Sequence, residues 1–203
     1  MNTTPITRPA AMLAAPLAAL DARVLGAIGM AASPMMLVET IRYDFGPSTM
    51  DPFTSLGGVF YMIGAICSLV ALRRIRASGD GAVARWLHRL QLALAGLAAV
   101  WSGVMALGEP FGPATRFVLR LSDPAWPLTH VSMLALGLCM VVARRVEGWR
   151  RFPALACGLA LPSFFALVPL GVPRPLGAAV FGVLTTVGFF GLGLAALTSR
   201  ERS

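Results

Sequence analysis

The chain has 203 residues, a mean hydropathy of +0.74 and only 13% charged residues, which is too apolar for an ordinary soluble domain. Its formal net charge of +8 comes from 17 basic residues, all of them arginine. These arginines lie mainly in the connections between apolar segments, which favours contact with anionic lipid and argues against a nucleic-acid partner. The lack of lysine excludes a Schiff base to retinal or pyridoxal phosphate.

The first twenty residues have two interpretations. Arg8 is followed by the apolar run Ala10–Leu20, an order that is typical of a cleaved signal peptide. Pro16 interrupts that run, however, and a long apolar segment begins only a few residues later. A short helix at the membrane interface is therefore the favoured interpretation, with cleavage as the alternative.

Six apolar segments of 18 to 23 residues then follow along the chain: Val24–Ile41, Phe53–Leu72, Leu90–Gly108, Trp126–Ala143, Phe152–Leu170 and Leu176–Thr198. A helix of this length reaches roughly 27 to 35 Å, about the thickness of a bilayer's hydrocarbon core. Because lipid offers no hydrogen-bond partner to the backbone, such segments must pair their own polar groups as helices. We predict an all-α integral membrane protein, with six transmembrane helices in three hairpins, forming one polytopic domain over residues 1–203.

The arginines predict which side of the membrane each connection occupies. Thirteen of them fall on one side if both termini share it: Arg8, Arg23, Arg73, Arg74, Arg76, Arg85, Arg89, Arg144, Arg145, Arg150, Arg151, Arg200 and Arg202. Only Arg42, Arg116, Arg120 and Arg174 fall on the other. By the positive-inside rule we predict cytoplasmic N and C termini in a cell (inner) membrane. Trp86 and Trp149 then mark the inner boundary, and Tyr43 and Trp126 the outer one.

Two outer connections share an order of residues. The first runs Glu39, Phe45-Gly46-Pro47-Ser48-Thr49, Asp51-Pro52, and the second runs Glu109, Phe111-Gly112-Pro113-Ala114-Thr115, Asp123-Pro124. We interpret this as a parallel internal repeat of two-span units; the alternative is two similar turns built from the same turn-forming residues. In each copy, Asp followed by Pro predicts an N-cap and first helical position. Within the second connection, Ala114–Ser122 predicts a short amphipathic helix on the membrane surface.

Several residues predict how the helices pack. Small residues four apart allow close approach within the bundle or against another subunit, in the pairs Gly64 with Ser68, Ala99 with Gly103, Ala178 with Gly182 and Gly191 with Ala195. Pro34 and Pro162 should bend their helices and each free one carbonyl. Gln91, Thr185 and Thr186 are expected to bond across helices. Cys67, Cys139 and Cys157 are expected to pack as small apolar residues, with a soft-metal site as the alternative.

Ionisable groups inside a membrane are costly, so each is a candidate for function. Glu39 and Glu109 end the first and third spans, where the helix dipole disfavours a carboxylate, and His130 lies about one turn inside the fourth. All three share the outer third of the bilayer and could meet in one pocket, with Asp123 and Tyr43 at its rim. We expect Arg42, Arg116, a bound cation or a proton to offset the unfavourable negative charge of the two glutamates.

These residues lead to one favoured function and several alternatives. We expect binding or transport of a small solute, ion or lipid at an outward-facing pocket formed by the first, third and fourth spans. The alternatives are a purely structural role for the polar groups, an enzyme acting on a lipid or isoprenoid with a glutamate as acid and His130 as base, and an accessory subunit that assembles as a homo- or hetero-oligomer through its Gly/Ala faces. No motif identifies a catalytic residue, a cofactor or a metal site.

Overall fold

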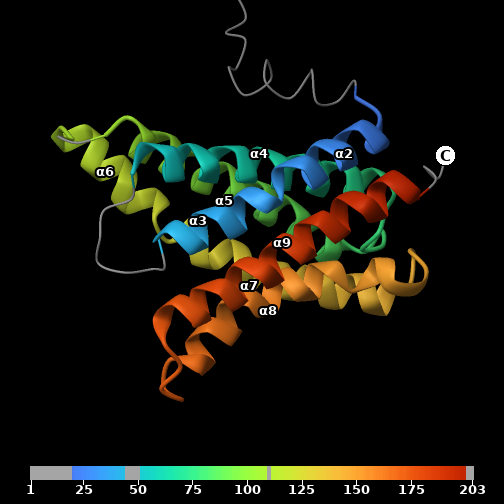
Figure 1. Cartoon of the computed structure of the whole chain (residues 1–203). Helices are drawn as coiled ribbons and strands as arrows, with labels where there is room; N and C mark the ends of the chain where they lie inside the picture. Colours follow the sequence, from blue (N-terminus) through green and yellow to red (C-terminus); the bar gives the residue numbers. More distant parts are fainter. Residues whose placement is uncertain (1–19, 44–50, 109–110, 200–203) are drawn as a thin grey trace, which may run out of the picture.

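A computed structural model describes residues 20–43, 51–108 and 111–199, and these residues form helices and the turns between them (Figure 1). In chain order the helices are α2 (Ala22–Ala32), α3 (Pro34–Tyr43), α4 (Pro52–Arg74), α5 (Ala82–Ala106), α6 (Pro113–Ser122), α7 (Ala125–Ala143), the short 3₁₀ helix η1 (Gly148–Arg151), α8 (Pro153–Leu167) and α9 (Arg174–Thr198). The all-helical prediction is confirmed for the described residues. The predicted N-terminal interfacial helix or signal peptide lies outside them.

In the described part of the chain, five helical segments are long and apolar enough to cross a membrane: Ala22–Arg42, Pro52–Arg74, Ala82–Ala106, Pro113–Ala143 and Arg174–Thr198. The predicted fifth span is shorter than expected, because α8 has 15 residues and reaches only about 22 Å. The third span is longer than predicted. Its helix begins at Ala82, eight residues before Leu90, because the Arg- and His-bearing residues there form two polar turns of the same helix.

The helices form a ring in chain order. Each long helix contacts the next, in the sequence α2, α4, α5, α7, α8 and α9, and α9 returns to contact both α2 and α3. Figure 1 shows that the start of α2, the α4–α5 and α7–α8 connections and the end of α9 lie at one end of the bundle. The start of α4, helix α6 and the α8–α9 turn lie toward the opposite end. The two groups of predicted connections therefore separate in space.

Glycines allow the first and last spans to meet. A Cβ at Gly26 of α2 would lie 2.6 Å from the Gly193 carbonyl oxygen of α9, so the two backbones are in direct contact there. The pair Gly64 and Ser68 packs in the same manner against Gly29 of α2. Pairs on α9 pack on α3 and α8, since Gly182 contacts Thr40 and Gly191 contacts Pro153. The predicted Ala99–Gly103 face makes no such contact, because the nearest atom to a Cβ at Gly103 is 3.9 Å away.

The first span is broken at Pro34, as its sequence predicts. Proline cannot donate to the carbonyl four residues earlier, which belongs to Met30. The Ser33 hydroxyl donates to that carbonyl at 2.9 Å, and the Ser33 carbonyl accepts from Thr186 of α9 at 3.2 Å. The predicted cross-helix role is thus confirmed for Thr186, whereas Thr185 bonds within its own helix. Pro162, in contrast, lies inside the assigned span of α8.

The two Asp-Pro pairs behave differently. The Asp51 carboxylate caps α4 by accepting from the Thr54 N–H at 2.8 Å, with Pro52 in the first turn, as predicted. The matching prediction for Asp123 is wrong, because Asp123 has helical dihedral angles at the end of α6 and caps no helix with its side chain. Helix α6 itself confirms the predicted short amphipathic helix. The turn into α7 is so tight that Asp123 keeps helical dihedral angles, and its carboxylate is not used as a helix cap.

Candidate functional site

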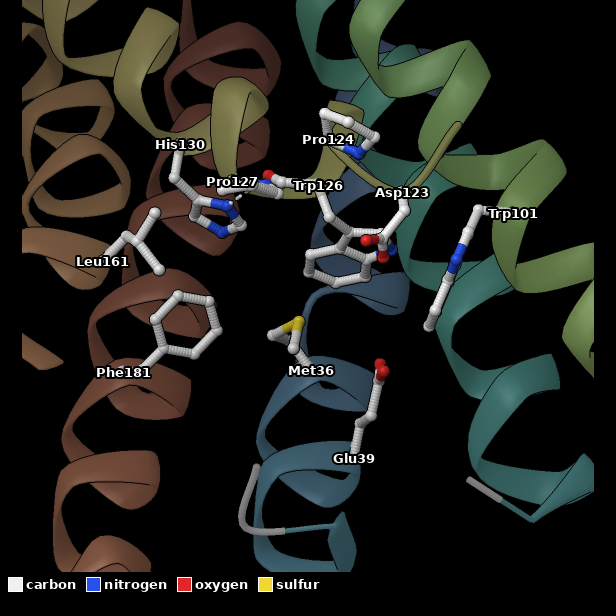
Figure 2. A pocket seen from close by; sticks show the side chains of 10 residues that line it. All are labelled: Met36, Glu39, Trp101, Asp123, Pro124, Trp126, Pro127, His130, Leu161 and Phe181. Carbon is white, nitrogen blue, oxygen red and sulfur yellow. Dashed lines mark hydrogen bonds between the residues drawn. The ribbon is translucent and has the colours of Figure 1, made fainter. Parts of the chain in front are cut away.

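A cavity of about 320 Å³, here named the outer cavity, lies between the α3, α5, α7, α8 and α9 helices (Figure 2). It lies toward the arginine-poor end of the bundle, since its walls come from the end of α3 and the start of α7. The side chains around it are two carboxylates, three aromatic rings, one imidazole and apolar groups. They belong to Met36, Glu39, Trp101, Asp123, Pro124, Trp126, Pro127, His130, Leu161 and Phe181.

Glu39 is the buried acid of the outer cavity. It is only 5% exposed, and its Oε2 atom has no hydrogen-bond partner among the described residues. Gly58 of α4 leaves room for it, because a Cβ at that position would lie 3.4 Å from Oε2. The expected compensation by Arg42 is wrong, since Arg42 pairs with Asp51 at 3.2 Å and covers the Phe53 ring at 4.7 Å. Arg116 is exposed on α6 and does not line the cavity.

Asp123 supplies the second carboxylate. It is exposed and lines the same cavity from the α6–α7 turn. In Figure 2 the Glu39 carboxylate points toward that of Asp123, which lies beside the indole of Trp126 on the side that faces Trp101. Among the described residues, no basic side chain lines the cavity apart from the imidazole of His130. This side of the cavity therefore combines two carboxyl groups with aromatic walls.

His130 occupies the other side, and its ring is 1% exposed. Its Nδ1 lies 3.0 Å from the Trp126 carbonyl oxygen. Because a carbonyl can only accept, Nδ1 carries a proton, and in the neutral ring Nε2 then keeps a lone pair. That Nε2 is buried and has no hydrogen-bond partner among the residues that the structure describes. The ring is held between Trp126, stacked at 5.7 Å, and Phe181, whose centroid is 4.9 Å away.

Further unpartnered polar atoms lie beside the outer cavity. The Trp126 Nε1, Ser102 Oγ and Tyr61 hydroxyl are buried and lack hydrogen-bond partners among the described residues. Ser102 approaches the same glycine as Glu39, since a Cβ at Gly58 would lie 2.8 Å from its Oγ. The Tyr61 ring stacks on Trp126 at 6.1 Å. Buried polar atoms are nearly always hydrogen-bonded in proteins, so this group suits a site that receives polar contacts from a ligand or water.

Of the predicted site residues, the structure brings Glu39, Asp123 and His130 to one cavity. Glu109 lies outside the described residues. Tyr43 is the last residue of α3, but its side chain is likewise not described. Trp126, predicted at the outer membrane boundary, lines the cavity from the first turn of α7 with its Nε1 buried, and its depth in the membrane stays a prediction. Its spacing of four from His130, which places both on one helix face, was a signal for this position.

Sequence reasoning missed Trp101 and Tyr61, which carry no local signal of their own in apolar spans. In the view of Figure 2, Trp126 and Met36 lie between Glu39 and His130, which places the acid and the imidazole in separate parts of the cavity.

Within the described residues there is no group of three His, Cys, Asp or Glu side chains that could hold a metal ion. Comparisons with protein-family models, curated proteins and solved structures found no match to this chain.

Proposed function

We propose that this chain is a six-span membrane protein that binds a small organic cation in the outer cavity, on the side away from the cytoplasm. The observation that carries the proposal is the buried side chain of Glu39, whose Oε2 has no hydrogen-bond partner in the described part of the chain. A carboxylate in an apolar wall is costly unless a cation or a proton neutralises it. Because Arg42 is engaged by Asp51, a ligand cation is the partner that also suits the rest of the cavity.

The walls favour an organic cation over a bare metal ion. Indole faces attract alkylated ammonium groups, which keep little water and gain about 0.5 to 2 kcal/mol from each good ring contact. Trp101 and Trp126 line the cavity together with the two carboxylates, and Met36 and Phe181 add apolar surface (Figure 2). A volume of about 320 Å³ accommodates a small amine with an apolar body.

The six-span topology is part of the proposal. Helix α8 is short, but the apolar residues Val168 to Leu170 continue it as a turn, and its neighbours α7 and α9 lie on either side of it in the ring. Of the described arginines, four lie at the end of the bundle with the start of α4, and ten lie at the end with the α4–α5 and α7–α8 connections. These ten are Arg23, Arg73, Arg74, Arg76, Arg85, Arg89, Arg144, Arg145, Arg150 and Arg151. This asymmetry supports cytoplasmic termini in the cell membrane. A reporter fused after Asp80 should remain cytoplasmic, and an exported reporter would overturn this orientation.

An internal duplication is proposed with it. Two units, α2–α3–α4 and α5–α6–α7, are neighbours through α4 and α5, and an Asp-Pro pair precedes the second span of each. In the first unit the aspartate caps a helix, whereas in the second it lines the outer cavity. On this proposal, the aspartate of the second unit has lost the capping role of its counterpart and has gained a binding role.

Binding is tested with the purified full chain in neutral detergent. Choline and phenyltrimethylammonium should quench the fluorescence of Trp101 and Trp126 and raise the melting temperature. The neutral isostere of choline, 3,3-dimethylbutan-1-ol, should do so far more weakly. Glu39→Gln should weaken cation binding about 10-fold to 100-fold, because charged hydrogen-bonding partners contribute about 1.5 to 3 kcal/mol. Asp123→Asn should cost less, since that carboxylate is exposed.

The matched control is Glu147→Gln, which removes an exposed carboxylate at the opposite end of the bundle. Cation binding by this variant should equal that of the unmodified chain. Equal binding of choline and its neutral isostere would refute the proposal. So would a Glu39→Gln variant that binds the cations as tightly as the unmodified chain does.

A further inference from the structure

A second cavity lies at the arginine-rich end of the bundle, far from the carboxylates of the outer cavity. It has a volume of about 190 Å³ and is formed where the last turn of α4 meets the first two turns of α5. We name it the arginine pocket, after the side chains that line it: Arg73, Arg76, Ser78, Asp80, Arg85 and His88. The proposed cation site makes no use of these residues.

The charges of the arginine pocket do not cancel. Asp80 is its only carboxylate, and it contacts two guanidinium groups, from Arg76 at 3.7 Å and from Arg145 at 3.4 Å. Arg85 donates to the Asp80 backbone carbonyl, and Arg73 has no ion pair within the described part of the chain. Since each guanidinium offers five N–H donors, most of the donors around this cavity remain free to bind an anion.

The backbone directs one of these arginines in an unusual way. Two residues after α4 ends at Arg74, Arg76 has φ 54°, a left-handed conformation that glycine normally supplies after a helix. The following N–H, from Ala77, donates back to the Leu72 carbonyl at 3.0 Å and holds the turn. The chain thus keeps a charged residue in a position that L-residues rarely adopt, beside the cavity that this residue lines.

Buried neutral groups complete the arginine pocket. Ser78 is 6% exposed and His88 is 2% exposed, and the Ser78 Oγ lies 3.1 Å from the His88 Nδ1. Both line the cavity. A hydroxyl and an imidazole held together in the wall add directional hydrogen bonding, which a merely basic membrane surface does not have.

From this arrangement we infer that the arginine pocket binds a phosphate group. Planar guanidinium forks match the oxygens of phosphate, and arginine rather than lysine is the residue for such bidentate contacts. The phosphate belongs either to a phospholipid headgroup or to a soluble phosphate ester. Trp86 of α5 is 61% exposed, which is typical of a ring at the headgroup level of a membrane.

The test uses the full chain in neutral detergent and two probes that share the phosphate. The first is short-chain phosphatidylglycerol, counted by native mass spectrometry against the matching diacylglycerol, which lacks the phosphate. The second is inorganic phosphate, measured by thermal shift against sodium chloride of equal ionic strength. Binding of the lipid alone assigns a headgroup, and binding of both or of inorganic phosphate alone assigns a site open to soluble esters.

Three variants separate a built site from general attraction to positive charge. The double variant Arg73→Gln with Arg85→Gln should lower phosphate affinity at least tenfold. The control Arg89→Gln with Arg150→Gln removes the same charge from the same end, outside the cavity, and should change affinity less than twofold. Ser78→Ala leaves the charge intact and should lower affinity about threefold. An equal loss in the control pair, an unchanged Ser78→Ala variant, or no binding of either probe by the unmodified chain would overturn the inference.

Discussion

The contact between α2 and α9 allows a direct test of the ring. At Gly26, an added methyl group would meet backbone atoms of the last span, at 2.6 Å from the Gly193 oxygen and 3.0 Å from the Leu197 nitrogen. Backbone atoms cannot rotate aside as a flexible side chain can, so Gly26→Ala must push the two helices apart. Overpacking typically costs about 1 to 3 kcal/mol, and a clash with backbone atoms at this distance belongs to the upper part of that range, about 2 to 3 kcal/mol.

A second contribution opposes this cost. Alanine stabilises a helix interior by about 0.8 to 1 kcal/mol relative to glycine. The net effect of Gly26→Ala is therefore a loss of about 1 to 2 kcal/mol. Gly96 of α5 provides the matched control, because a Cβ there meets nothing within 4 Å. Gly96→Ala gains the helix preference without the clash and should stabilise the chain by up to about 1 kcal/mol.

The assay is thermal unfolding in detergent, followed with a thiol-reactive fluorophore. Cys67 and Cys157 are buried and free, so they react as the bundle opens. With roughly 2 to 4 °C per kcal/mol for a chain of this size, the two variants should move the melting temperature in opposite directions and differ by about 6 °C. Melting of Gly26→Ala at or above the unmodified chain's temperature would refute the packing of α2 on α9.

Three further predictions test local features. The Thr54 N–H that donates to Asp51, with help from Arg42, lowers the pKa of the Asp51 carboxyl. The charged cap therefore stabilises α4 at pH values above the carboxyl pKa of the unfolded chain, and this stabilisation is lost as the pH falls through the lowered pKa of the folded chain. Asp51→Asn should keep a cap but show a smaller fall in melting temperature between roughly pH 6 and pH 3. Gln91→Leu removes the 3.0 Å bond to the Thr129 carbonyl and should cost about 0.6 to 1.7 kcal/mol in the same thermal assay, and an unchanged melting temperature would contradict this cross-helix bond. Ser33→Ala removes the hydroxyl that donates to the Met30 carbonyl and should speed amide hydrogen exchange in α3 relative to α4. Exchange in α3 as slow as in the unmodified chain would show that this hydrogen bond does not stabilise the helix break.

Part of the candidate site was predictable from the free-energy cost of placing ionisable side chains in apolar helices. Glu39 and His130 stand out in apolar spans, since few ionisable side chains are tolerated at that depth. Their approximate depth follows from the spacing along each helix, and the two do line the same cavity. Whether they bind a ligand is a prediction that the proposed cation and its neutral isostere will test.

Other features of the site could not be predicted. The choice of Arg42 between Glu39 and Asp51 depends on the geometry of a turn, and the sequence offers both partners. The release of Asp123 from capping depends on the two dihedral angles that keep it in α6. The positions of Trp101 and Tyr61 beside the same cavity depend on how α4 and α5 rotate against α7.

The sequence by itself determined the properties that belong to single segments: the apolarity of the helices, the arginine asymmetry, the break at Pro34 and the amphipathic α6 helix. Only the tertiary structure decided which helix faces turn inward, that α9 closes the ring on α2, and which aromatic rings surround Glu39. The physical reason is that lipid is as apolar as a protein core. Hydrophobic periodicity, which separates core from surface in a soluble protein, therefore leaves the inner and outer faces of these helices alike until they pack.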